Sequence, residues 1–293
     1  MKFSGHETFH IREGWLYKGL SLVENDPEKL DACYVHDLLG VGSNMAKSIK
    51  HWLAILGLTE HTSDGKGVQL TSLGRLLYAK DPHCLHPLTW WILHANLVLN
   101  EDAATSWHWL FNFFFQPRFD RDLCAETLRR YLQYKGARVP SKQTLDRDIA
   151  CLLSSYARAI PEDPEADPEE SYDCPFQELG LINFYRETGF YQFASGVKHI
   201  PPHALGYVLS KVFPGESEGK HTTVPLNEAA TTVNSPGKCF LLSTSELFEL
   251  VESAATKIGE NDIALTGLAA NRLIRFRYHI PEEWVAAGLK KLR

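Results

Sequence analysis

The sequence predicts a mainly α-helical protein with small β wings, built from tandem winged helix-turn-helix units around a helical hub. Three observations favour this fold class: a pattern of helix, glycine turn, helix and hairpin at residues 34–70, the return of its apolar spacing one hundred residues later, and an aromatic-rich stretch in between. We expect four parts. They are an N-terminal segment with the first winged helix (1–82), the helical hub (83–136), a second winged-helix-like unit (137–200) with an acidic insertion at 161–173, and a C-terminal winged-helix-like unit (201–293).

The first winged unit has the clearest periodicity. Residues 34–39 predict a short amphipathic helix, which ends at the glycine pair Gly40 and Gly42. A longer helix follows, with apolar side chains at helical spacing: Met45, Ile49, Trp52, Leu53 and Leu56. Residues 59–60 and 68–70 then predict two short strands of a wing, joined by a turn.

The longer helix and the wing predict contacts with DNA, because the second helix of such a motif enters the major groove. Ser43 or Asn44 is expected to cap this helix. The expected contacts on its outward face and in the wing turn are Ser43, Asn44, Lys47, Lys50, His51 and Lys66. The alternative is that Lys47 and Lys50 only form a solvated helix face. The agreement of turn, helix and wing favours DNA contact.

The same apolar spacing returns in residues 139–160. Its members are Leu145, Ile149, Leu152, Leu153 and Tyr156, and Arg147 stands where Lys47 stood. This predicts a second recognition helix with Lys142 and Arg147 as DNA contacts and wing strands at 179–182 and 189–193. Chance coincidence among amphipathic helices is the alternative. A weaker third version predicts a strand and helix within 236–259 and a strand pair within 263–276.

An aromatic-rich stretch separates the first two units. Its large rings are Trp90, Trp91, Trp107, Trp109, Phe111, Phe113, Phe114 and Phe115. Such rings can stack on unpaired bases, as in single-strand-binding proteins. A concentration of this kind is more typical of a buried helical hub, which is the interpretation we favour.

Composition sets the cellular frame. The chain has 293 residues, of which 44% are hydrophobic and 23% charged, as in ordinary globular proteins. The formal net charge is −6, but residues 161–173 alone hold seven acids and no base, so DNA binding has to come from a small basic face. Because no apolar run reaches the roughly 18 residues of a membrane span and no secretory signal is visible, we expect a cytoplasmic protein without a membrane partner.

The stretch from His6 to His10 reads H-E-x-x-H, the zinc motif of metallopeptidases. That motif needs a helix buried beneath a cleft and a third ligand further along the chain. Here it follows a glycine near the start of the chain, and no third ligand stands at a suitable distance. The six cysteines are widely spaced and are expected to be small core residues. We therefore expect no zinc.

Several motifs together resemble a bacterial family of unknown function that is encoded beside phosphoadenosine-phosphosulfate-reductase-like genes. They are FSGHETFHIREGWLYKG, LGVGSNMAKSIKHWLAILGL, LTSLGRLLYAKDP, LTWWILHANL, ATSWHWLFNFF and CPFQELGLI. The family includes a subunit of single-strand DNA phosphorothioation systems, with which a DNA-nicking activity is associated. The resemblance implies double-stranded DNA as a partner, and a cysteine desulfurase, an ATPase and an ATP-pyrophosphatase-type sulfur transferase as protein partners.

The resemblance also points to the N-terminal segment as a catalytic site. In the family signature Gly5, Phe9 and the residues between them recur together with Arg12, whereas the residue at His10 is not fixed. Phosphodiester attack needs deprotonation, charge neutralisation and positioning. His6 would act as general base or acid, Glu7 as its partner or a Mg²⁺ ligand, and Arg12 as a phosphate clamp. In the structural alternative Glu7 pairs with Arg12, and Phe9 and Trp15 fasten the segment to the first winged unit.

These expectations lead to two functional hypotheses. The first is a DNA-binding subunit of a phosphorothioation and defence system that nicks one strand, with Mg²⁺ as its cofactor. The second is a non-catalytic winged-helix protein that regulates transcription or recruits partners. A regulator normally adds a dimerisation or effector domain, and no clear one is visible in the sequence.

Overall fold

The computed structural model describes residues 1–161, 174–195, 198–215, 221–268 and 271–291. Its chain divides into two compact units. Unit 1 comprises residues 1–84 and 96–196, and unit 2 comprises residues 85–95 and 197–293. This grouping is coarser than the four parts expected from the sequence, which remain a prediction. The acidic insertion 161–173 lies outside the described residues except for Pro161.

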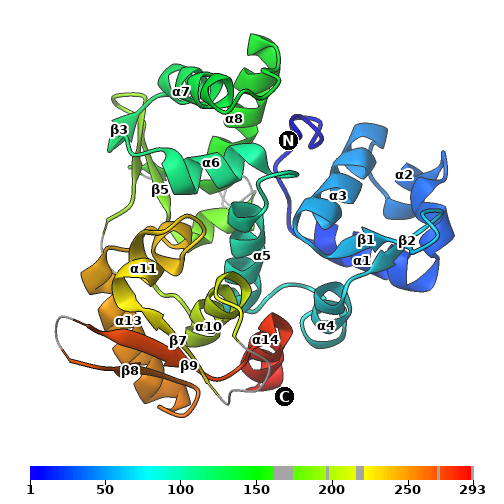
Figure 1. The fold of residues 1–293 in the computed structure, drawn as a ribbon. Coiled ribbons are helices and arrows are strands. Elements are labelled where there is room, and N and C mark those ends of the chain that lie inside the picture. The colour runs from blue at the N-terminus through cyan, green and yellow to red at the C-terminus, as the bar shows by residue number, and fades with distance from the viewer. Residues whose placement is uncertain (162–173, 196–197, 216–220, 269–270, 292–293) are drawn as a thin grey trace. The chain divides into compact units, whose positions relative to one another are not determined.

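Unit 1 starts with a helical module (Figure 1). Its elements are α1 (Trp15–Asn25), η1 (Pro27–Asp31), α2 (Val35–Leu39), α3 (Ser43–Ile55), β1 (Thr59–His61), β2 (Val68–Leu70) and α4 (Ser72–Lys80). The core helix α1 packs against α3, α4 and β2. Strands β1 and β2 pair antiparallel, with Thr59 opposite Leu70. The predicted order of helix, helix and strand pair is therefore present, while its assignment as a winged helix remains a prediction.

A glycine turn joins α2 to α3, as predicted. Gly40 ends α2 with φ 61° and ψ 47°, a left-handed conformation that glycine adopts without steric cost. The expected capping of α3 by Ser43 or Asn44 is wrong, because Gly42 occupies the cap position and no side chain caps the helix. Ser43 already belongs to the first turn of α3.

The rest of unit 1 is a helical core with a four-stranded sheet. Its helices are the last residues of α5 (Pro87–Leu99), α6 (Thr105–Phe113), α7 (Arg121–Tyr134), α8 (Lys142–Tyr156) and η2 (Pro175–Leu179). Its strands are β3 (Arg118–Phe119), β4 (Ala157–Ile160), β5 (Ile182–Tyr185) and β6 (Phe190–Phe193), in the order β3-β6-β5-β4. Only the β4–β5 pair is parallel. Helix α8 leads directly into β4, so the second unit has a larger sheet than the two-stranded wing predicted for it.

The predicted cores are largely confirmed. All five apolar positions of α8 are buried, and of the five on α3 only Met45 remains half-buried. Among the eight aromatic rings of the hub stretch, only Phe115 is exposed, at 69%, and Phe113 is half-buried. Buried rings cannot stack on bases, so base stacking is excluded for most of this stretch, while the helical hub remains a prediction. Of the six cysteines, only Cys33 is exposed, and none forms a disulfide.

Unit 2 packs helices against a three-stranded sheet. Besides the first part of α5, its elements are α10 (Pro202–Val212), β7 (Thr222–Pro225), α11 (Leu226–Thr231), α12 (Pro236–Cys239), α13 (Thr244–Ile258), β8 (Ile263–Thr266), β9 (Leu273–Phe276), α14 (Pro281–Gly288) and η3 (Leu289–Lys291). The sheet order is β7-β9-β8, and both pairs are antiparallel. The predicted strand pair within 263–276 is confirmed. The strand expected at the start of 236–259 is wrong, since Ser235 caps the short helix α12 there.

The helices of both units are too short or too polar to cross a bilayer. Within the described ranges, none of them combines the length and the apolar character that a membrane span requires.

Candidate functional site

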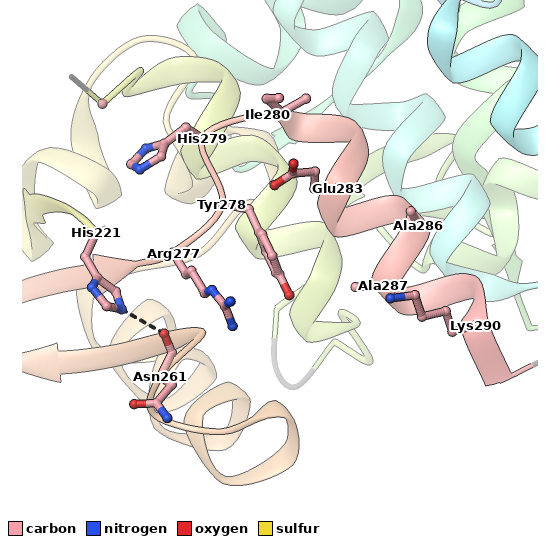
Figure 2. A pocket seen from close by; sticks show the side chains of 11 residues that line it. His221, Asn261, Arg277, Tyr278, His279, Ile280, Glu283, Ala286, Ala287 and Lys290 are labelled. Atoms are coloured by element: carbon pink, nitrogen blue, oxygen red, sulfur yellow. Dashed lines mark hydrogen bonds between the residues drawn. The ribbon is translucent and has the colours of Figure 1, made fainter. Parts of the chain in front are cut away.

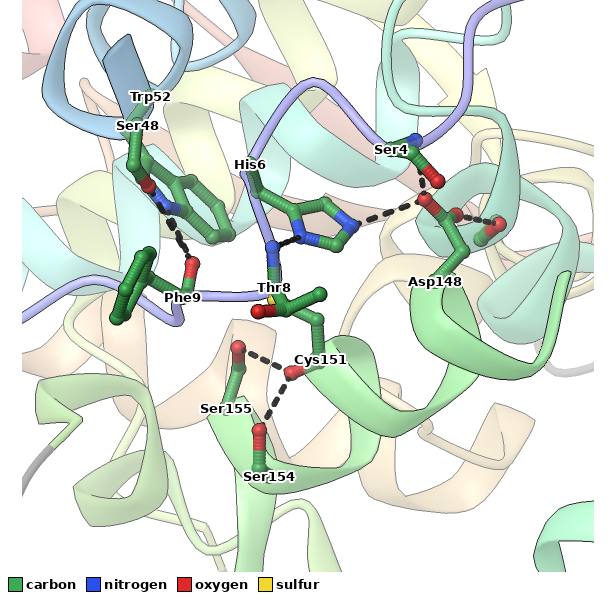
Figure 3. Close-up of polar contacts among 11 residues, drawn as sticks. Ser4, His6, Thr8, Phe9, Ser48, Trp52, Asp148, Cys151, Ser154 and Ser155 are labelled. Atoms are coloured by element: carbon green, nitrogen blue, oxygen red, sulfur yellow. Dashed lines mark hydrogen bonds and ion pairs between the residues drawn. The ribbon is translucent and has the colours of Figure 1, made fainter. Parts of the chain in front are cut away.

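The N-terminal segment, residues 3–12, lies between α3 and α8 (Figure 3). On the α8 side Asp148 is its anchor, with one carboxylate oxygen accepting from the Ser4 backbone N–H at 2.8 Å and from His6 Nε2 at 2.9 Å. The other oxygen accepts a hydrogen bond from the Ser106 hydroxyl. His6 and Asp148 are only 1% and 2% exposed. A buried carboxylate with three donors is well compensated for its lost hydration.

Helix α3 holds the same segment from the other side. The Trp52 indole Nε1 donates to the Phe9 carbonyl at 3.1 Å, and the Ser48 hydroxyl lies 3.5 Å from the same oxygen. The Phe9 and Trp15 rings meet edge to face, with centroids 6.4 Å apart. The part of the structural alternative in which Phe9 and Trp15 fasten this segment is therefore confirmed.

The segment makes a turn whose backbone is strained. Glu7 and Thr8 have φ values of 50° and 70°, and a left-handed conformation is unusual for a β-branched residue such as threonine. The His6 ring stabilises this turn, because its Nδ1 accepts the Thr8 backbone N–H at 3.1 Å. Since Nδ1 is an acceptor, the ring proton sits on Nε2, which donates to Asp148. The turn leaves the Glu7 and Thr8 side chains exposed.

The three predicted catalytic residues do not form one polar cluster. His6 is buried with both ring nitrogens engaged, whereas Glu7 and Arg12 are exposed. The Arg12 guanidinium lies 6.0 Å from the centre of the Trp15 ring. Glu7 and Arg12, both within the described residues, form no ion pair, so this part of the structural alternative is wrong. Their catalytic roles remain predictions, and a role for His6 would require the segment to open.

The H-E-x-x-H stretch is a turn followed by extended chain, not a helix. The two imidazoles are therefore not one helical turn apart, and the peptidase geometry is not reproduced. In the described part of the chain, no group of three or more His, Cys, Asp or Glu side chains is arranged to hold a metal ion.

The predicted DNA contacts of α3 divide into two groups. Ser43, Asn44 and Lys47 are exposed, with the Lys47 ammonium 3.3 Å from the Asn44 side-chain oxygen. The Lys50 ammonium forms an ion pair with Asp31, which lowers its value as a phosphate contact. Lys66 is exposed at the turn between β1 and β2.

His51 departs from the expected outward orientation. Its ring is half-buried, with its centroid 6.3 Å from that of His6. Burial lowers the pKa of His51 to about 4. His51 is therefore neutral at pH 7 and adds no positive charge to a DNA-binding face.

Helix α8 carries the second set of predicted contacts. Lys142 and Arg147 are both exposed on it, as the apolar periodicity requires. The residue that sequence reasoning missed is Asp148, directly after Arg147. A signal existed, because an offset of one hundred residues aligns Asp148 with Ser48, and each is a buried polar residue that contacts the N-terminal segment.

Unit 2 contains a cavity of about 1210 Å³ (Figure 2). Its polar lining includes His221, Arg277, Tyr278, His279, Glu283 and Lys290. Figure 2 shows that the Arg277 and Tyr278 side chains extend into it. Arg277 pairs with Asp262 at 3.3 Å, and Glu283 offsets the charge of Lys290, so the lining has no clear preference for anions or cations. We assign this cavity no role.

Comparison with known proteins places the chain. The family model described as protein of unknown function (DUF4007) matches residues 3–286, nearly the whole chain. No curated protein matches. The fold is similar to a magnesium ion-bound SspB crystal structure, with 22% identity over 99% of this chain and 89% of that one and a TM-score of 0.84. A second SspB crystal structure has 23% identity over 98% and 86% of the two chains and a TM-score of 0.82. The resemblance found in the sequence motifs is thus confirmed, and the chain belongs to the DUF4007 family.

Proposed function

We propose that this protein is a DNA-binding subunit of a bacterial DNA phosphorothioation and defence system, and that it nicks one strand of DNA. The observation that carries the proposal is the exposed face of α3 with Ser43, Asn44 and Lys47, which is followed along the chain by a hairpin with exposed Lys66 in its turn. Hydroxyl, amide and ammonium groups on one helix are suited to phosphates and base edges. The fold shared with SspB supports the proposal.

The winged-helix interpretation follows from the same region. Helix α2, the Gly40 turn and α3 are followed by the antiparallel pair β1–β2, which is the element order of that motif. Lys142 and Arg147 on α8 supply a second exposed cationic helix face. Partners in the same system would be a cysteine desulfurase, an ATPase and a sulfur transferase, as the family resemblance implies.

Glu7 and Arg12 are the residues we propose for chemistry on the phosphodiester. Both are exposed on the segment that His6 and Asp148 hold in place, so they can meet a DNA backbone without rearrangement. His6 acts as a positioning residue in this arrangement, since its Nδ1 supports the strained turn. Arg12 would neutralise phosphate charge, and the Glu7 carboxylate would hold a metal ion at the phosphate.

Mg²⁺ is the cofactor we propose, because proteins bind it through one or two carboxylates together with substrate phosphates and water. Asp148 does not fit as its ligand, since both carboxylate oxygens accept hydrogen bonds inside the core. The exposed Glu7 carboxylate does fit. When bound, the ion would supply charge neutralisation at the phosphate.

The first experiment tests DNA binding. Charge reversal at Lys47 and Lys50 should weaken duplex binding and reduce the salt dependence of log K by about 0.9 for each phosphate that is no longer neutralised. Because Lys50 is paired with Asp31, we expect the reduction to correspond to one phosphate rather than two. Reversal of Arg75 and Lys80, which are exposed on α4, is the matched control. Unchanged affinity in the folded α3 variant would contradict the proposed DNA-binding face.

The second experiment tests nicking. Purified protein is incubated with supercoiled plasmid, with Mg²⁺ or with EDTA, and conversion to the open circle is measured. Glu7→Gln and Arg12→Ala should each abolish Mg²⁺-dependent nicking while duplex affinity persists.

The buried position of His6 favours one other function, a non-catalytic recruitment module. Tight duplex binding without any nicking would establish that alternative.

A further inference from the structure

The four-stranded sheet of unit 1 has two different faces, which the strand registers define. One face carries Phe119, Tyr191, Phe184 and Ala159 in one row across the strands. Phe119 and Tyr191 are buried, and their rings stack with centroids 5.9 Å apart. Phe114, at the end of α6, packs on Phe119 at 4.9 Å. This face is therefore part of the core.

The opposite face, which we call the outer sheet face, consists of two rows. The first row runs Arg118, Gln192, Asn183, Arg158 across β3, β6, β5 and β4, and the second runs Phe190, Tyr185, Ile160 across β6, β5 and β4. Side chains alternate along a strand, so both rows point to the same side. Arg118, Arg158 and Ile160 are exposed, and the other four are half-buried.

We propose that the outer sheet face binds an unpaired strand of nucleic acid. This inference rests on the proposed function, in which the protein acts on one strand of DNA. Four-stranded sheets with surface aromatics are a general solution for stacking bases. Here Phe190 and Tyr185 are directly paired across β6 and β5, so two aromatic residues are cross-strand neighbours on this surface.

The polar groups of this face match the same ligand. The Arg118 guanidinium lies over the Phe190 ring, 4.2 Å from its centre, so a cation and an aromatic ring are stacked on this face. Within the described residues, the side-chain amides of Asn183 and Gln192 make no hydrogen bond, so both can donate to and accept from base edges. Among the seven residues of the two rows, Arg118 supplies a positive charge and none is a carboxylate, which suits a phosphate backbone.

A protein partner fits this face less well. Only Phe190, Tyr185 and Ile160 are apolar, and stable protein interfaces bury on the order of 1,000 Å² or more around an apolar centre. A cation beside two amides and two aromatic residues is typical of a surface that binds an unpaired strand.

The test uses the full chain and fluorescence anisotropy with a labelled oligothymidylate and with a duplex of the same length. Tyr185→Ala should weaken binding of the single strand about fivefold or more, as expected when one base no longer stacks on a ring. Tyr185→Phe should retain the affinity of the parent, because the ring is kept. Arg118→Ala should reduce the salt slope for the single strand by about 0.7. Tyr134→Ala is the matched control, because Tyr134 on α7 is 89% exposed and lies outside the sheet.

Photo-crosslinking supplies a measurement that needs no variant. An oligonucleotide containing 5-iodouracil should crosslink to Tyr185 or Phe190 in the parent protein. The inference would be overturned if neither Tyr185→Ala nor Arg118→Ala changed the affinity for the single strand. Crosslinks confined to other elements would also overturn it. In that case, retained duplex binding that is sensitive to Lys47 and Lys50 would leave the proposed function intact. A parent protein that binds neither DNA would refute both.

Discussion

Removal of the Asp148 side chain should strongly lower the stability of unit 1. Asp148→Ala leaves the Ser4 amide, His6 Nε2 and the Ser106 hydroxyl without their acceptor in a site where Asp148 is 2% exposed. An unsatisfied buried donor costs about 1–3 kcal/mol, and hydrogen bonds to charged groups lie at the upper end. Some of these donors regain water when the segment opens, so we expect a loss of about 3–5 kcal/mol in the free energy of unfolding.

Urea denaturation followed by circular dichroism measures this loss, and hydrogen exchange followed by mass spectrometry locates it. Peptides from residues 3–12 should exchange faster in Asp148→Ala, because the segment loses its anchor on α8. Asp146→Ala, on the same helix but more exposed, is the control. A double-mutant cycle with His6→Ala should give a coupling of about 1–3 kcal/mol. A loss below about 1 kcal/mol together with unchanged exchange would refute the reasoning.

Two further predictions concern packing and pH. In Gly74→Ala the new Cβ would lie 2.1 Å from the Leu58 carbonyl oxygen, so we expect a loss of about 1–3 kcal/mol by urea denaturation. Gly42→Ala meets only ordinary contacts and should lose only what alanine costs at a helix N-cap, less than about 1 kcal/mol. Burial lowers the pKa of His94 to about 4, below its unfolded value near 6.5, although its bond to the Cys239 carbonyl opposes this. The contribution of neutral His94 to the free energy of unfolding is fully present above about pH 6.5 and is lost as the pH falls toward 4. At pH 5 the loss is roughly 2 kcal/mol. Stability of His94→Gln measured at pH 7 and pH 5 should fall less than that of the parent, and an equal fall would contradict this account.

Local sequence signals predicted the helices of unit 1 well. Apolar spacing located α3 and α8, and the glycines located the turn before α3, because these patterns depend on near neighbours in the chain. The sheet of the second unit was harder, because β3 pairs with β6 across more than seventy residues and β4 joins in parallel. Pairing at such separations leaves no local pattern. The helix α12 was misread as a strand because its apolar neighbours, such as Phe240, are buried in either structure.

For the candidate site, the sequence predicted several exposed positions but not the contacts between the side chains. Hydrophobic periodicity identified the exposed positions of Lys47 and Arg147, since residues outside the buried apolar stripe of a helix face solvent. It could not show that His51 faces His6, because that contact depends on where the N-terminal segment lies. It could not pair Lys50 with Asp31 or His6 with Asp148 for the same reason. The partners of these side chains depend on tertiary contacts, which the periodicity of the sequence does not contain.

The geometry also separates the N-terminal motif into two kinds of residue. Gly5 is required because a Cβ there would lie 2.3 Å from the His51 ring, His6 is bound to Asp148, and the Phe9 carbonyl is bound to Trp52. Packing therefore explains these three positions. It does not explain Glu7, which keeps a strained left-handed backbone and an exposed carboxylate. Strain held at an exposed polar residue costs stability without improving the core, so we propose that it serves function. The buried part of the motif would then present its exposed part.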